Sequence, residues 1–178
     1  RDAFYQYFSG DFNGLVLSEL REKRSMVYSA YGVVTTPALP GYPTTFIGQI
    51  GTQNDKANEA LALYMDLLRN MPENPDRMDK IKSYLRQEAL TTHPDFRDKA
   101  QYFEQYKRVG YTQDPAIENV PKIDALTFDD IMKYYKEKPI AIDIMGNPKD
   151  LNVDELKKFG KVIKLSEKKL FNSKDALF

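Results

Sequence analysis

Arg21 and Tyr28 are the two side chains whose types and spacing suggest chemistry in this sequence, and six residues lie between them. A guanidinium presents several hydrogen-bond donors in a fixed geometry, and a phenol adds a hydroxyl that donates or accepts. Each also has a structural explanation: the helix dipole favours an arginine near a helix C-terminus, and a strand tyrosine is often half-buried. The role of the pair therefore depends on the elements that hold it.

A helix followed directly by a strand would bring these two side chains together. The apolar residues of segment 13–24 recur at helical spacing, with charged residues between them. Residues 26–35 then alternate with the two-residue period of a strand, which places Tyr28 on one face with Ala30 and Gly32. The junction is short enough to hold Arg21, on the last helical turn, close to Tyr28.

No other group of residues has a recognised catalytic pattern. His93, the one histidine, stands before a proline and reads as a helix-boundary residue, and there is no cysteine for a thiolate zinc site. One histidine with carboxylates would suit zinc poorly. P-loop, G-x-G-x-x-G and G-x-S-x-G patterns are absent. We interpret Glu19 and Glu22 as solvated or paired with Lys23 and Arg24. We therefore expect no catalytic residue, metal ligand or cofactor in this chain.

The composition excludes two classes of partner. The 178 residues include 26 basic and 26 acidic side chains, so no general attraction to nucleic acid or to anionic membranes is indicated. No apolar run approaches the roughly 20 residues that span a bilayer. Apolar residues at 42% and charged residues at 29% are typical of a globular domain of ordinary size.

The order of elements predicts an α+β fold, with helices packed on one face of a mainly antiparallel sheet. A second strand at 44–51 pairs with 26–35, and Thr52 with Asp55 suggests a capping box for the helix that follows. Later helices are expected near 57–71, 75–90 and 96–109, followed by a short helical segment from Pro115 and a helix capped by Thr127 with Asp130. A small helix over 153–159 should stop at Gly160, and short strands are expected at 140–145 and 162–165. We predict one domain over 1–165 and a Lys-rich tail over 166–178.

The string SELREKRSMVYSAYG resembles the signature of the second, non-catalytic domain of the pitrilysin/insulinase-type zinc peptidases, the inverzincins. That signature is a Leu-Arg-Glu segment followed by a Gly-Leu-x-Tyr-Ser type segment, and Arg21 and Tyr28 have its spacing. Ser25 stands where the family usually carries glycine. The IDIMGNPKDL segment and the Leu-x-x-Phe-Gly helix end resemble the close of the same domain. The family domain begins with a strand that we expect to be missing here.

The resemblance implies an assisting role in peptide hydrolysis. In these enzymes two related halves close around an unfolded peptide, and one half holds zinc in an H-x-x-E-H motif. The other half supplies an arginine and a tyrosine that contact the substrate backbone, which here would be Arg21 and Tyr28. The expected partner is a zinc-bearing homologous domain, on the same polypeptide or on another chain. The present chain alone is expected to be inactive.

Two alternatives remain open from the sequence. The chain could belong to a family member that has lost peptidase activity and serves as a scaffold or assembly subunit, with a merely structural Arg–Tyr pair. It could also be an unrelated peptide- or protein-binding α+β module whose motif match is a coincidence.

Overall fold

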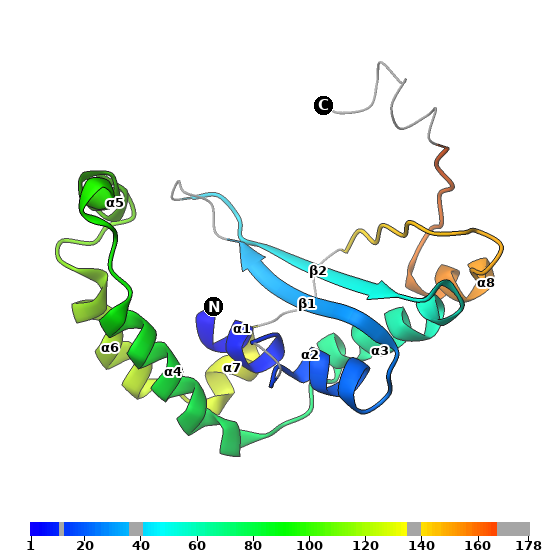
Figure 1. Cartoon of the computed structure of the whole chain (residues 1–178), viewed down its shortest axis with the longest axis horizontal. Helices are drawn as coiled ribbons and strands as arrows, with labels where there is room; N and C mark the ends of the chain where they lie inside the picture. The colour runs from blue at the N-terminus through cyan, green and yellow to red at the C-terminus, as the bar shows by residue number, and fades with distance from the viewer. Residues whose placement is uncertain (11–12, 36–40, 135–139, 167–178) are drawn as a thin grey trace.

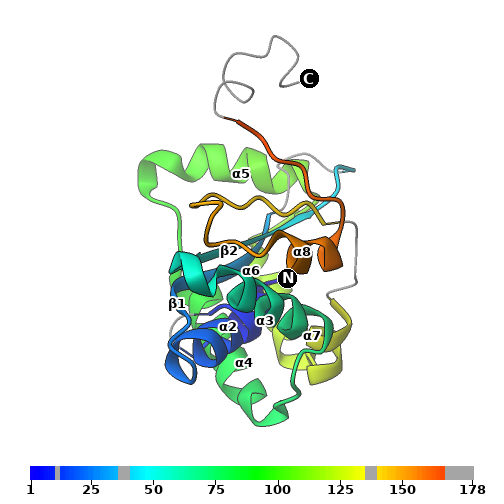
Figure 2. The ribbon, with the colours of Figure 1, turned by 90° about the vertical axis from the view of Figure 1, so that its right-hand side faces the viewer.

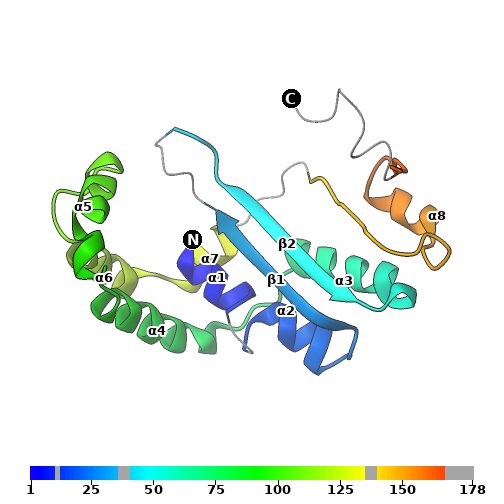
Figure 3. The ribbon, with the colours of Figure 1, turned by 45° about the horizontal axis from the view of Figure 1, so that its top comes forward.

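The computed structural model describes residues 1–10, 13–35, 41–134 and 140–166, and among these it contains one sheet. The sheet is the antiparallel pair of β1 (Val27–Thr35) and β2 (Thr45–Thr52). Three helices lie against one face of the pair (Figure 1 and Figure 3). They are α1 (Asp2–Phe8), α2 (Leu15–Leu17) and α3 (Ala57–Arg69). The fold is α+β, as the sequence predicts.

Three further helices form an arm that extends away from the sheet. α4 (Met78–Thr91) and α6 (Pro115–Ala125) pack along each other, and α5 (Lys99–Arg108) stands at the far end of the arm (Figure 1). Arg86 Nη1 lies 2.9 Å from both carboxylate oxygens of Asp124, which joins α4 to the end of α6. The sequence places Phe96, Ala100 and Phe103 along this helix, but α5 contains no buried residue and all three side chains are exposed.

The last elements return to the body of the molecule. α7 (Phe128–Tyr134) packs against α1, while α8 (Val153–Leu156) lies beside α3 (Figure 2). Asn58 fixes the second contact, because its amide nitrogen donates to the Asn152 carbonyl at 2.8 Å and its amide oxygen accepts from the Asn152 N–H at 3.1 Å. Gly160, with φ +151°, ends the short helix as predicted.

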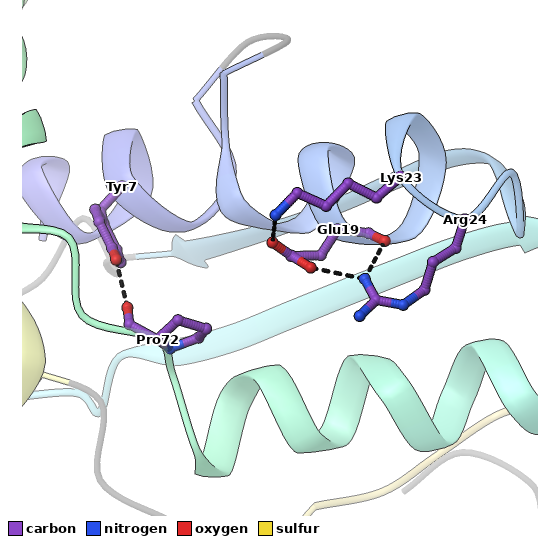
Figure 4. A network of polar contacts seen from close by, with 5 residues as sticks. All are labelled: Tyr7, Glu19, Lys23, Arg24 and Pro72. Carbon is purple, nitrogen blue, oxygen red and sulfur yellow. Dashed lines mark hydrogen bonds and ion pairs between the residues drawn. The ribbon is translucent and has the colours of Figure 1, made fainter.

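An aromatic cluster from α1 forms the centre of the core. Phe4, Tyr7 and Phe8 are almost completely buried, and the rings of Phe4 and Phe8 stack at 5.4 Å. The Tyr7 hydroxyl donates to the Pro72 carbonyl (Figure 4), and the Arg77 guanidinium lies 4.8 Å from the centre of the Tyr7 ring. The core therefore forms between α1, the sheet and the start of the arm.

One predicted cap is confirmed and one is wrong. At α7, the Thr127 N–H donates to Asp130 Oδ2 at 2.8 Å and the Asp130 N–H donates to Thr127 Oγ1 at 3.3 Å, which is a complete capping box. Before α3, a 3₁₀ turn η2 (Asn54–Lys56) begins after Gln53 without any side-chain cap. The hydroxyl of Thr52 instead donates to the Met26 carbonyl, because Thr52 ends β2 opposite the start of β1.

The strands predicted at 140–145 and 162–165 are not strands in the described structure. Ile140 and Ile144 are 44% and 39% exposed, whereas Ile142 packs against the core. Alternating apolar residues give a segment the period of a strand, but a strand also needs a partner within hydrogen-bonding distance. Residues 167–178 of the predicted tail lie outside the described residues.

Ser9 accepts a hydrogen bond from the outer edge of β1. Its Oγ accepts a hydrogen bond of 2.8 Å from the Gly32 N–H, and the contact is buried. A side chain at residue 32 would collide with Phe8 and Phe46, since a Cβ there would lie 2.8 and 2.7 Å from their rings. The turn after α1 and the middle of β1 are thus fitted to each other.

Replacing Ser9 with alanine tests this contact. Ser9→Ala leaves the buried Gly32 N–H without its acceptor, so we expect the free energy of unfolding to fall by about 1–3 kcal/mol. Ser83→Ala, on the exposed side of α4, is the matched control and should change it by less than about 0.5 kcal/mol. Urea unfolding of both variants measures the difference, and equal values would contradict the assigned role of Ser9.

Candidate functional site

Arg21 and Tyr28 line the same shallow depression on the surface. The depression has a volume of about 380 Å³ and is also lined by Glu22, Ser25 and Val27. The Arg21 side chain is 44% exposed, and Tyr28 is 66% exposed. Arg21 Nε lies 3.8 Å from Glu22 Oε1 at its edge. The structure therefore brings together the two residues that the sequence singles out, and leaves both accessible.

A β-bulge turns Tyr28 outward. Val27 pairs with Thr52 and Ser29 pairs with Gly51, so Tyr28 is an extra residue with no partner position on β2. Without the bulge, the two-residue period would place Tyr28 on the same face as Ala30, which is 5% exposed and part of the core. A bulge inserts one residue and re-aims the side chains before it. The face predicted for Tyr28 from simple alternation is therefore wrong.

The corner between the helix and β1 depends on Ser25. The helix from α2 continues as a π-helical turn, η1 (Ser18–Glu22), and Ser25 then adopts φ +49°. The Ser25 N–H donates to the Arg21 carbonyl at 2.8 Å, and the Met26 N–H donates to the Leu20 carbonyl at 2.8 Å. Helices commonly end at a residue with a left-handed φ, where N–H groups bond to carbonyls of the last helical turn. Glycine is the usual residue at that position.

Two side chains from the end of β2 and the turn after it brace the corner. The Thr52 hydroxyl donates to the Met26 carbonyl, and Lys56 Nζ donates to the Ser25 carbonyl at 3.2 Å. Both carbonyls lie just before the bulge that exposes Tyr28. The sequence pattern assigned Thr52 to a helix cap and therefore did not predict these contacts. The pairing of β1 with β2 was the only signal that could have indicated them.

Glu19 forms ion pairs with Lys23 and Arg24 at the end of the π-helical turn that carries Arg21. Its carboxylate accepts from Lys23 Nζ and from Arg24 Nη1, both at 2.6 Å, and Arg24 Nη1 also donates to the Glu19 carbonyl at 2.8 Å (Figure 4). Hydrogen bonds from Lys23 and then Arg24 lower the pKa of Glu19 below its usual value. The predicted pairing of Glu19 is confirmed, whereas Glu22 pairs with Arg21 instead.

His93 is exposed beyond the end of α4. In the described part of the chain, no three His, Cys, Asp or Glu side chains are grouped so that they could hold a metal ion. The described helices also include none that is long and apolar enough to cross a membrane.

No known protein family and no curated protein matches the sequence. Among solved structures, the chain is similar to the crystal structure of a peptidase M16 inactive domain from Pseudomonas fluorescens. The TM-score is 0.60 and the sequence identity 20%, over 75% of this chain and 32% of the other. The chain has the fold of a peptidase M16 inactive domain. It spans about a third of the length of that M16 protein.

This likeness supports the sequence resemblance at the level of the fold. M16 is the pitrilysin/insulinase-type family, whose non-catalytic domain was suggested by the SELREKRSMVYSAYG string. The resemblance implies a glycine position at Ser25, and the left-handed φ of Ser25, +49°, is a conformation that favours glycine.

Ser25→Gly tests the corner. A left-handed conformation costs a residue with a Cβ about 1–2 kcal/mol, and glycine avoids this cost. Glycine also gives the unfolded chain more conformational freedom, which offsets about 0.4–1 kcal/mol of the gain in stability. We expect the free energy of unfolding to rise by about 0.5–1 kcal/mol, a gain of a few degrees in Tm. Ser83→Gly, inside α4, is the control and should lower stability by up to about 0.5 kcal/mol. Loss of stability in both variants would contradict a left-handed Ser25.

Glu19→Gln tests the pairing of Glu19 with Lys23 and Arg24 through the pH dependence of stability. The folded-state pKa of Glu19 lies below its unfolded value of about 4.3, so its stabilising contribution is present above that value and is lost as pH falls through the folded pKa. We expect Glu19→Gln to lower stability by about 0.5–1 kcal/mol at pH 7 and by less at pH 3. Glu104→Gln, which breaks an exposed pair with Lys107, should have almost no effect at either pH. Chemical denaturation at both pH values measures this, and a pH-independent loss would contradict it.

Proposed function

We propose that this chain is the non-catalytic domain of a zinc-dependent endopeptidase, where it binds an extended peptide opposite a zinc site on another domain or chain. The observation that carries the proposal is the depression shared by Arg21 and Tyr28 on a domain with an M16-like fold. The zinc would belong to the partner domain, where it would activate a water molecule for attack on the peptide. This chain would contribute binding and charge stabilisation.

The chemistry of the pair suits a peptide backbone. The guanidinium of Arg21 offers N–H donors in a fixed plane, which suits a carbonyl oxygen of an extended substrate. The hydroxyl of Tyr28 is on a 66% exposed side chain, and it would donate to the oxygen that gains negative charge when the scissile bond is attacked. The Thr52 and Lys56 contacts hold the backbone just before Tyr28.

Substitution of the pair tests this function in the assembled enzyme. Arg21→Ala and Tyr28→Phe should each lower kcat/KM by about 10²–10³, because the loss of one such donor costs about 2.7–4 kcal/mol of transition-state stabilisation. The measurement is peptide hydrolysis by this chain combined with its zinc-bearing partner. Zinc content should stay unchanged in both variants, because the metal is held elsewhere.

Tyr42→Phe is a matched control, since Tyr42 is also 66% exposed but lies outside the depression. It should leave hydrolysis unchanged. Full activity of both Arg21→Ala and Tyr28→Phe would contradict the substrate role and would favour the scaffold alternative.

A further inference from the structure

α5 stands apart from the other helices and strands of the described structure. It begins after the 3₁₀ turn η4 (Phe96–Asp98), none of its residues is buried, and beyond η4 it makes no extensive contact with another described element. It also lies well away from the corner between α2 and β1 that carries the depression (Figure 1 and Figure 3). Helices in proteins gain most of their stability by packing an apolar face, so α5 lacks a contact that such a helix usually has.

One face of η4 and α5 is apolar and exposed. Phe96 is 87% exposed and Phe103 is 59% exposed, although phenylalanine is among the residue types most often buried. Ala100 is exposed between them, and Lys107 follows Phe103 on the same face, with its Nζ 5.3 Å from the centre of the Phe103 ring. These four residues, the α5 stripe, are spaced by four, three and four positions. That is the spacing of the a and d positions of a coiled-coil heptad.

Two charges of opposite sign lie along one side of the α5 stripe. Arg97 and Glu104 are seven residues apart, so they occupy the same heptad position, and both are exposed. Glu104 has a loose ion pair with Lys107, in which Oε1 and Nζ are 3.6 Å apart. The Arg97 guanidinium forms no hydrogen bond or ion pair with any residue that the structure describes. This flank therefore carries one charge that is unpaired and another that is only weakly paired.

Two copies of α5 fit each other as an antiparallel pair. In that pair Ala100 of each copy lies opposite Phe103 of the other, so a small side chain meets a large one. Phe96 lies opposite Lys107, whose aliphatic stem can cover the ring. A twofold axis across the helices brings the same flank of both copies together, so Arg97 of each copy lies beside Glu104 of the other. Symmetry makes every contact occur twice, which gives two ion pairs across the interface.

The same residues disfavour a parallel pair. In a symmetric parallel pair, each residue of the α5 stripe meets its own copy. Lys107 would then face Lys107, a like-charge contact that opposes association. Ala100 would face Ala100, which leaves a gap between the bulky phenylalanines on either side. The self-complementarity of this face in charge and in size is therefore specific to the antiparallel direction.

We propose that the α5 stripe, with Arg97 and Glu104 beside it, is a self-association surface that binds α5 of a second copy of this chain in an antiparallel pair. The two charges set the direction and register of the pair, and the phenylalanines supply the apolar contact. Each copy contributes one short helix, and interfaces below about 1,200 Å² are typical of weak, transient encounters. The dimer is therefore reversible and forms at high protein concentration.

Sedimentation equilibrium of this chain over a range of concentrations tests the proposal. We expect the weight-average mass to rise from 20.6 kDa toward twice that value as the concentration approaches about 1 mM. Arg97→Glu should raise the Kd by about tenfold or more, because like charges then meet at two symmetry-related positions. Phe103→Ala should also raise it, because the large side chain that faces Ala100 is lost. Glu118→Lys, a charge reversal on α6, is the matched control and should leave the Kd unchanged.

Reversal of both charges distinguishes the antiparallel pair from other contacts. Arg97→Glu combined with Glu104→Arg restores opposite charges across the antiparallel interface, so the Kd should return to within about threefold of the wild-type value. In a parallel pair Glu104 would instead lie beside Lys99 of the other copy, and the double reversal would add repulsion. Because α5 contributes no buried residue, all variants should keep the wild-type Tm.

Three results would overturn the proposal. The first is a chain that stays monomeric at about 1 mM, which would leave the α5 stripe open or covered by a different protein. The second is association that neither Arg97→Glu nor Phe103→Ala weakens, because another surface would then form the dimer. The third is a double reversal that fails to restore association, because Arg97 and Glu104 would then not meet across the interface.

Discussion

The left-handed turn at Ser25 is the constraint on which the candidate site depends. It ends the helix with two hydrogen bonds, to the carbonyls of Arg21 and Leu20, and it starts β1 only two residues later. The bulge at Tyr28 follows at once, so one short stretch fixes both the guanidinium and the phenol. Serine there bears a conformational cost that glycine would avoid, and contacts from β2 and from η2 hold the turn in place.

The two strands of the sheet differ in their surroundings. The aromatic residues of α1 and the Ser9 hydroxyl lock β1 into the core, which gives the depression a rigid base. β2 carries no charged residue. A firmly packed β1 suits the proposed role, in which Tyr28 contacts an extended peptide while the chemistry is done on another domain.

Most of the fold could be predicted from the sequence because its signals are local. The paired strands, the apolar stripe of α3, the capping box at Thr127 and the stop at Gly160 depend on residues close together in the chain. The predicted strands at 140–145 and 162–165 were wrong, since an alternating pattern says nothing about whether a partner edge lies close enough to pair. The Thr52 cap was wrong because a distant carbonyl, that of Met26, competed for its hydroxyl.

The sequence by itself determined that Arg21 lies near the end of a helix and that Tyr28 lies at the start of a strand, and the spacing of the two resembles an M16-type signature. Only the tertiary structure decided that Tyr28 faces solvent. Its side chain would lie on the buried face if β1 and β2 paired residue for residue, and the extra residue in the ladder exists only once the two strands meet. A bulge is a property of a pair of strands, so no single stretch of sequence could have specified it.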